Sequence, residues 1–164
     1  MAANESSKYT HFSNVAIGTS SGGGGLEVKG IEQGMGFAKT VSADTTLTAD
    51  DSGKTIILDN ATGEVITLPA LADGLRFKFV VGAAFATDNW VIDSAEGDNI
   101  NGIIADMGAT VAGVPAVAED QINFVATAET IGDWVELVAD SGNSQWLVTG
   151  MCTANGGITV TDPS

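Results

Sequence analysis

The stretch that decides the fold is KTIILDNATGEVITLPA, Lys54 to Ala70. It holds two short runs rich in β-branched residues, separated by a DNATGEV segment whose Asn and Gly can adopt the positive φ angles of a tight reversal. The stretch therefore predicts a β-hairpin. Its first strand is apolar on both faces, because Ile56 and Leu58 point to the side opposite Ile57. We expect two covers for such a strand: a second sheet and a neighbouring subunit.

Similar β-rich runs, punctuated by Gly, Asn and Asp about every ten residues, continue along the chain from Ser42. A second hairpin is predicted in WVELVADSGNSQWLVTG, where residues 140–143 are strong turn formers. These runs predict an all-β fold, a compact β-sandwich or jelly-roll-like domain of about nine short strands. The predicted strands are Lys54–Asp59, Glu64–Leu68, Leu75–Val81, Trp90–Ser94, Asn99–Ile104, Gln121–Thr127, Trp134–Asp140, Ser144–Met151 and Gly157–Thr161.

The segment LRFKFVV shows most clearly which face of a strand is buried. Its leucine, phenylalanines and second valine alternate with Arg76 and Lys78, so one face belongs to the core and the other carries cations. These are two of the three cations in residues 41–164. The cationic face is either solvated, salt-bridged within the sheet, or part of a subunit contact.

The interval GIIADMGATVAGVPAVAEDQ, residues 102–121, lacks clean alternation and is rich in Ala, Gly and Val. We predict a loop or irregular crossover here, and its apolar character indicates that a neighbouring subunit covers it. The candidates for a subunit interface are therefore Ile57, Arg76, Lys78, Val114 and Pro115.

Charge divides the chain into two parts. The formal net charge of −15 lies on residues 41–164, which hold 18 carboxylates, whereas residues 1–40 are neutral. We predict an extended, partly flexible N-terminal arm over residues 1–40 and a β-sandwich domain over residues 41–164, with SSGGGG as a flexible joint in the arm. The arm is either a docking segment or a disordered tail. Its apolar anchors are Tyr9, Phe12, Val15 and Ile17.

The acidic balance argues against nucleic-acid or anionic-membrane partners, because both present phosphate surfaces that repel such a body. The first twenty residues lack the apolar run of a signal peptide, and no segment approaches the roughly 20 apolar residues of a membrane span. Cys152 is the single cysteine, so no disulfide forms within one chain. We expect a chain that is soluble in the cytoplasm during synthesis.

Motifs of catalysis are missing from the sequence. His11 is the only histidine and lies in the arm, so a Ser-His-Asp or Cys-His arrangement cannot form within the body. The glycine runs do not match a phosphate-binding loop. Most carboxylates stand at turn positions, where they bond their own backbone. A pair of catalytic carboxylates, as in a glycosidase, remains an alternative role for some of them. We expect no enzymatic activity and no cofactor.

Two further groups of residues have more than one interpretation. Trp90, Trp134 and Trp146 are predicted to be core residues, interface anchors or, as a third option, stacking platforms for sugars. DSAEGDNIN, residues 93–101, offers Asp93, Glu96, Asp98, Asn99 and Asn101 as oxygen ligands, but without EF-hand spacing. A plain Asx-rich turn is favoured over a weak calcium site, so no metal is predicted.

Residues 45–161 resemble the head decoration, or cement, proteins of tailed bacteriophages, with related modules in some head and tail fibres. The resemblance rests on T-x-x-D-S-G-K in TADDSGK, on TLPA and GLRF around the second predicted strand's turn, and on W-x-[VL]-x-G in WLVTG. It also covers DNINGIIAD and the Gly-rich ending ANGGITVTD.

This resemblance implies a compact β-domain, usually a homotrimer, that sits outside an icosahedral capsid at threefold positions. It implies an N-terminal arm that reaches across neighbouring capsomers, with copies of the chain and the major capsid protein as partners. The expected location is the outer surface of the virion. The alternatives are a fibre or tail module that binds host-surface glycans, and a glycoside-active enzyme.

Overall fold

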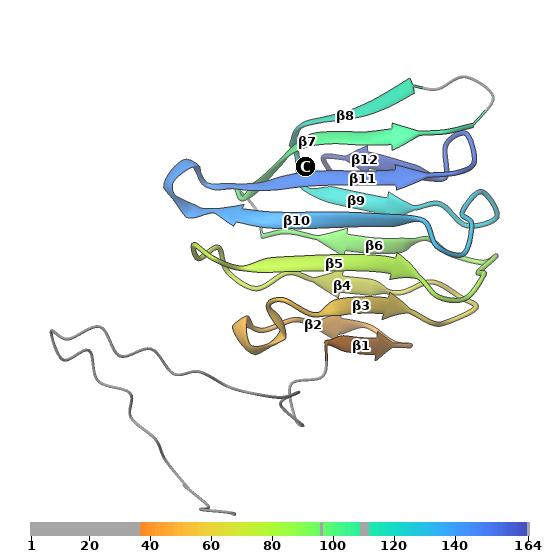
Figure 1. Ribbon diagram of the computed structural model, residues 1–164, viewed down its shortest axis with the longest axis horizontal. Helices are drawn as coiled ribbons and strands as arrows, with labels where there is room; N and C mark the ends of the chain where they lie inside the picture. The colour runs from red at the N-terminus through yellow and green to blue at the C-terminus, as the bar shows by residue number, and fades with distance from the viewer. Residues whose placement is uncertain (1–36, 96, 109–111, 164) are drawn as a thin grey trace, which may run out of the picture. The chain divides into compact units, whose positions relative to one another are not determined.

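The computed structural model describes residues 37–95, 97–108 and 112–163. They form two facing β-sheets (Figure 1). The seven-stranded sheet, called sheet A, has the order β1-β3-β5-β10-β11-β7-β8, and the five-stranded sheet, called sheet B, has the order β12-β9-β6-β4-β2. The predicted all-β sandwich is confirmed. Each of the nine predicted strands corresponds to a strand of the structure, and β1, β2 and β8 are additional.

The first half of the domain is built from parallel strands that alternate between the sheets. Sheet A takes β1 (Ala38–Val41), β3 (Thr55–Leu58) and β5 (Arg76–Val81), and sheet B takes β2 (Thr45–Thr46), β4 (Val65–Thr67) and β6 (Trp90–Asp93). Within each sheet these strands pair in parallel, β1 with β3 and β3 with β5 in sheet A, and β2 with β4 and β4 with β6 in sheet B. This stacked half departs from the antiparallel connections of a jelly roll.

The hairpin predicted for Lys54–Ala70 is therefore wrong. Its two strands, β3 and β4, lie in different sheets and share no ladder. Residues 59–64 between them form an arch, which here means a connection that carries the chain from sheet A to sheet B. The buried Ile56 and Leu58 of β3 and Ile66 of β4 lie in one core. Placing β3 and β4 in two facing sheets buries more of their apolar surface than pairing them side by side in one sheet would.

The arches stack on one another in the same order as the strands. The Asn60 amide donates to the Ser42 carbonyl at 2.9 Å, and the Asp88 N–H donates to the Thr62 carbonyl at 2.9 Å. Gly63 has a φ of 73°, and a Cβ there would collide with the carbonyl oxygen of Asp88. Glycine at this position is thus required both by conformation and by close packing.

The second half of the domain contains the hairpin that the sequence predicted correctly. Strands β10 (Trp134–Asp140) and β11 (Gln145–Cys152) pair antiparallel from Trp134↔Met151 to Asp140↔Gln145. The 3₁₀ turn η2 (Ser141–Asn143) joins them, and Ser144 has a left-handed φ of 51°. In sheet B, β9 (Gln121–Phe124) pairs antiparallel with β6 and with β12 (Ile158–Thr161).

The loop predicted for residues 102–121 is also wrong. Strand β7 (Asn99–Asp106) extends further than expected, and β8 (Ala112–Glu119) pairs with it antiparallel as the edge of sheet A. A register irregularity between Ile100 and Gly102 and a φ of 57° at Ala118 interrupt the alternation. Pro115 is tolerated because an edge strand does not need every N–H in a ladder. These features hide the strand pattern in the sequence.

The core lies between the sheets and follows the alternation predicted from LRFKFVV. Phe77, Phe79 and Val81 are buried, as is Leu75, whereas Arg76 is exposed and Lys78 is half-buried on the opposite face. Trp90 and Trp146 are fully buried, and Trp146 packs 5.9 Å from Phe77 between ring centroids. Two of the three tryptophans are therefore core residues.

The edge strand β1 ends the stack on the other side of sheet A. The backbone carbonyl of Phe37 accepts from the Thr55 N–H at 2.8 Å, so pairing with β3 starts within the region predicted as arm. Lys39 lies level with the buried Ile56 and therefore on the inner face. An inward-pointing charge on an edge strand discourages pairing with further strands.

Candidate functional site

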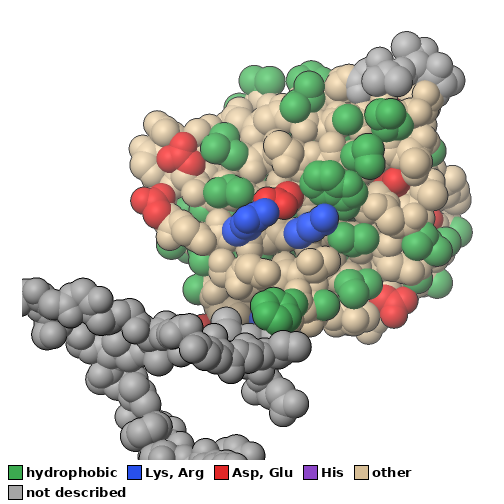
Figure 2. Space-filling model, viewed as in Figure 1, with side chains coloured by type: hydrophobic (Ala, Val, Ile, Leu, Met, Phe, Trp, Pro, Cys, Tyr) green, Lys and Arg blue, Asp and Glu red, His purple; other side chains and the backbone are tan. Residues whose placement is uncertain are grey.

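The candidate site is the outer face of sheet A, which points away from the core. The strand registers place its side chains in rows across the sheet. One row is Ile57, Val80, Trp134, Met151 and Ala105; the next is Thr55, Lys78, Glu136, Thr149, Ile103 and Pro115; a third is Arg76, Val138, Leu147 and Asn101. Figure 2 shows this face, with hydrophobic side chains gathered around a small group of Lys and Arg.

Large apolar side chains are exposed on this face from its central strand, β10, to its β8 edge. Ile103 is 57% exposed, Leu147 44%, Met151 39% and Val138 39%. Val117 of β8 is 69% exposed and continues the alternation of Pro115. They come from β10, β11, β7 and β8, which are four consecutive strands of sheet A. A contiguous apolar area of this kind marks a surface for binding another protein.

Cations gather at the edge of the apolar area, around a hollow of about 290 Å³. We call it the cationic hollow; its lining is Gly53, Lys54, Thr55, Arg76, Lys78 and Glu136. Arg76 Nη2 lies 2.6 Å from Glu136 Oε1. Lys78 Nζ lies 4.6 Å from the centroid of the Trp134 ring, a cation–π contact. The face thus combines tryptophan, arginine and aliphatic side chains, which are typical of protein–protein interfaces.

A partly buried ion cluster holds in place one of the residues that line the hollow, Lys54. Asp51, in the 3₁₀ turn η1 (Ala49–Asp51), accepts from Lys39 Nζ and from Lys54 Nζ, each at 2.9 Å. Burial raises the pKa of the Asp51 carboxyl, but the hydrogen bonds from Lys54, Lys39 and the Thr48 N–H outweigh it and lower this pKa to about 2. The cluster therefore ties β1 to the start of β3 and holds Lys54 at the hollow.

The structure brings four of the five predicted interface residues to one face. Ile57, Arg76, Lys78 and Pro115 all lie on the outer face of sheet A. Val114 instead packs against the core. Whether a neighbouring subunit covers this face is still a prediction. The four predicted arm anchors, Tyr9, Phe12, Val15 and Ile17, lie outside the described residues.

Sequence reasoning did not select Val138, Leu147 or Met151 of this face, and it offered Trp134 only as a core residue, an interface anchor or a sugar-stacking platform. Trp134, Val138, Leu147 and Met151 alternate with core residues along β10 and β11, so their outward direction could have been read from the strand pattern. The residues that lie beside them on neighbouring strands could not be predicted from the sequence. Only the register of β10 with β5 places Trp134 and Glu136 beside the two cations of β5.

The segment considered for calcium is occupied by contacts within the protein. Asp93 Oδ1 accepts from Gln121 Nε2 at 2.8 Å, and the Asn101 side chain bonds Gln145 and the Ala118 N–H. Glu96 lies outside the described residues. Among residues 37–95, 97–108 and 112–163, no three His, Cys, Asp or Glu side chains gather as a metal site would require.

Buried polar residues elsewhere hold turns together. Asp106 accepts from the Gly108 and Gly156 N–H groups, and these two bonds lower the pKa of its carboxyl. Asp133 Oδ1 accepts from the Thr153 hydroxyl and N–H. Cys152 is buried, and burial raises the pKa of its thiol.

Within the described part of the chain, no helix is long and apolar enough to cross a bilayer.

Comparison of the chain with models of protein families, with curated proteins and with solved structures found no match. The geometry of the outer face of sheet A defines the candidate site as an exposed, mixed apolar and cationic sheet face on a strongly acidic β-sandwich.

Proposed function

We propose that the chain is a viral structural protein, a decoration protein that binds the outside of a phage head as a trimer and stabilises the shell without catalysing a reaction. The observation that carries this proposal is the outer face of sheet A. A protein with a net charge of −15 leaves an apolar face with a small group of cations open to solvent, although its core is already complete. Such a face is explained by a protein partner.

The composition of the face fits binding between proteins better than binding of a small molecule. The described side chains on it come from strands of one sheet, so they are held rigidly and lose little freedom on binding. The cationic hollow, at about 290 Å³, is small for a ligand pocket and is lined mainly by charged and polar residues, whereas small-molecule sites are larger and mainly apolar. A lattice of many modest contacts of this kind holds through avidity.

The N-terminal segment supplies the second contact in this proposal. The part of this segment before β1, residues 1–37, has a net charge of only −1, and its anchors Tyr9, Phe12, Val15 and Ile17 are suited to docking on the shell. In a trimer, three such segments bind adjacent capsomers together, so that a weak contact per segment gives slow dissociation overall. The acidic remainder of the domain keeps the outside of the particle soluble.

The test compares two substitutions with the same chemistry at different places. Ile103→Asp introduces a charge into the apolar face, and Ile131→Asp introduces it at a residue that is equally exposed, 63% against 57%, but outside the strands of sheet A. We expect co-sedimentation with undecorated phage heads to be lost for Ile103→Asp and kept for Ile131→Asp. Equal binding by both variants would show that the face plays no part.

The arm is tested by deletion of residues 1–25. We expect the truncated chain to keep its oligomeric state by light scattering and to lose head binding. Retained head binding would refute the role of the arm. Gold labelling of intact virions then distinguishes head from tail, since label confined to the tail would contradict the whole proposal.

A second candidate is a fibre or tail module that binds host-surface glycans. The observation in its favour is Trp134, which is half-buried on the outer face, whereas Trp90 and Trp146 are fully buried and cannot stack on a sugar. Lys78 lies over the Trp134 ring, which leaves less of that ring for stacking. Loss of binding to a host glycan array in Trp134→Ala, with the fold intact, would favour this candidate.

A further inference from the structure

The charges of the described residues are distributed very unevenly. Their only cations are Lys39, Lys54, Arg76 and Lys78, and the last three line the cationic hollow. Lys39 and Lys54 pair with Asp51, and Arg76 pairs with Glu136. Within the described part of the chain, Lys78 is the one cation that has no carboxylate at salt-bridge distance. The hollow therefore holds one positive charge that is left for an acid from outside.

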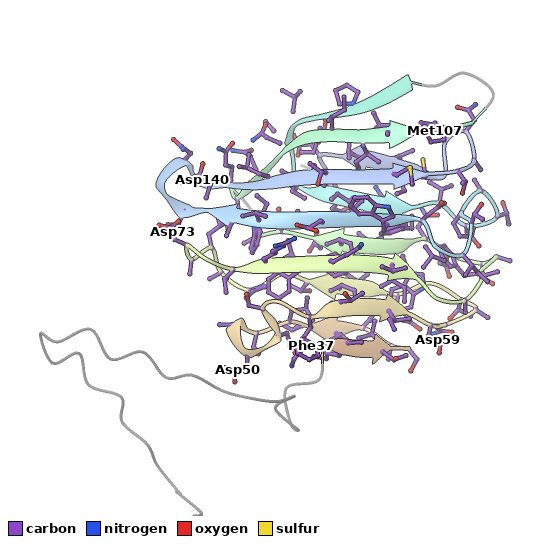
Figure 3. The ribbon with its side chains drawn as sticks, viewed as in Figure 1. Phe37, Asp50, Asp59, Asp73, Met107 and Asp140 are labelled. Carbon is purple, nitrogen blue, oxygen red and sulfur yellow. The ribbon has the colours of Figure 1, made fainter. Side chains whose placement is uncertain are left out.

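The arches form an acidic surface at the opposite end of the parallel strands. We call this surface the arch end; it consists of residues 42–44, 59–64 and 82–89, and its carboxylates are Asp44, Asp59, Glu64 and Asp88. It contains no Lys or Arg. Because β1, β3 and β5 are parallel, all three arches follow the strands' C-terminal ends, whereas the hollow lies at the N-terminal ends of β3 and β5. Figure 3 shows Asp59 at the end opposite Asp50 and Asp73.

We propose that the cationic hollow of one copy binds the arch end of a second copy, so that the chains associate head to tail. This inference rests on the part of the proposed function in which copies of the chain associate. Two bodies of this charge repel each other in most orientations. Contact of hollow with hollow brings Lys78 against Lys78, whereas contact of hollow with arch end brings Lys78 and Arg76 against Asp59 and Asp88.

The surroundings of the hollow also favour a second copy over a free anion. Apolar side chains such as Val138 and Leu147 adjoin Arg76 in the same row of the sheet. A docked protein surface covers these side chains and excludes water from the ion pairs, which strengthens them. A head-to-tail contact uses a different surface on each partner, so it closes into a ring when the rotation between copies allows and extends into a filament otherwise.

A charge swap tests this arrangement. The first variant, Arg76→Glu/Lys78→Glu, makes the hollow acidic, and the second variant, Asp59→Lys/Asp88→Lys, places two lysines at the arch end and removes its net negative charge. All four side chains lie outside the core, and the two aspartates are exposed. We expect sedimentation velocity on the full chain at low salt to show at least about a tenfold weakening of self-association in each variant. Mixing the two variants should restore association, because every contact between a chain of the first variant and a chain of the second again joins opposite charges.

Lys78→Gln serves as a milder variant in case three glutamates beside one another disturb the sheet, and melting by circular dichroism monitors the fold. Lys78→Gln should also weaken self-association relative to the wild-type chain. Three outcomes overturn the inference: a wild-type chain that stays monomeric at 100 µM, an Asp59→Lys/Asp88→Lys variant that associates like wild type, or variants whose mixture stays monomeric. If the wild-type chain is monomeric but Lys78→Gln loses head binding, the hollow binds the shell instead; the inference then fails together with the trimer, and only the shell-binding part of the proposed function stands.

Discussion

Replacing Asp51 with asparagine should destabilise the domain at neutral pH and should matter progressively less in acid. The carboxyl has its pKa lowered from 3.8 to about 2 because Lys54, Lys39 and the Thr48 N–H donate to the charged form. Each pKa unit corresponds to about 1.4 kcal/mol, so the charge of Asp51 contributes about 2 kcal/mol to the free energy of unfolding at pH 7. Its side chain is only 9% exposed, so solvent screening reduces this value little.

The direction of the pH dependence follows from the lowered pKa. The contribution is complete above pH 3.8, where both folded and unfolded chains carry the charge, and is lost as the pH falls through about 2. We expect Asp51→Asn to reduce the free energy of unfolding by about 2 kcal/mol at pH 7, by about 1 kcal/mol at pH 3 and by well under 1 kcal/mol near pH 2.

The measurement is urea unfolding of the wild-type chain and the variant at each pH. Other carboxyls with lowered pKa values, such as Asp106 and Asp140, are present in both proteins and cancel in the difference. Asp50→Asn is the matched control, because Asp50 is the exposed neighbour of the buried Asp51; it should change stability by no more than about 0.5 kcal/mol. A loss in Asp51→Asn that is the same at pH 3 as at pH 7 would refute the assignment of the effect to charge.

Three further predictions concern the arches and the core. Gly63→Ala should lower the melting temperature far more than Gly74→Ala, because both residues have positive φ but only the Cβ at position 63 collides with a neighbour, the Asp88 carbonyl; equal shifts would contradict the stacking of the arches. Phe79→Ala removes a fully buried ring and should cost about 3–5 kcal/mol in urea unfolding, whereas a loss below 1 kcal/mol would contradict its place in the core. Cys152 should resist a thiol reagent at pH 8 in the native state and react in urea, since its thiol is buried and burial raises its pKa; rapid labelling of native protein would be inconsistent with this.

The predicted strands show how much the local pattern of residues determines. The alternation in LRFKFVV assigned Phe77 and Phe79 to the core and Arg76 and Lys78 to the other face, and the structure agrees. This succeeds because successive side chains of a strand must point to opposite faces whatever the strand pairs with. The same reasoning located all nine predicted strands, since a strand's position depends on its own residues and the turns that flank it.

Strand pairing, in contrast, depends on distant parts of the chain. The segments around DNATGEV and DSGNS look alike, yet the first is an arch between sheets and the second is a hairpin within sheet A. Turn residues allow the chain to reverse in either way, and the choice depends on which arrangement buries Ile56 and Ile66 against other strands. The same holds for β8, whose proline and irregular register make it recognisable only beside β7.

The candidate site likewise has a part that the sequence predicts and a part that only the strand pairing decides. Arg76 and Lys78 could be assigned to an outward face from their own strand, and so could the outward direction of Trp134. Their assembly into one hollow bordered by Val138 and Leu147 follows from the antiparallel register of β10 with β5 and β11. Residues far apart in the chain meet there because the sandwich has to bury their neighbours on the inner face, and the outer face is arranged by the same pairing.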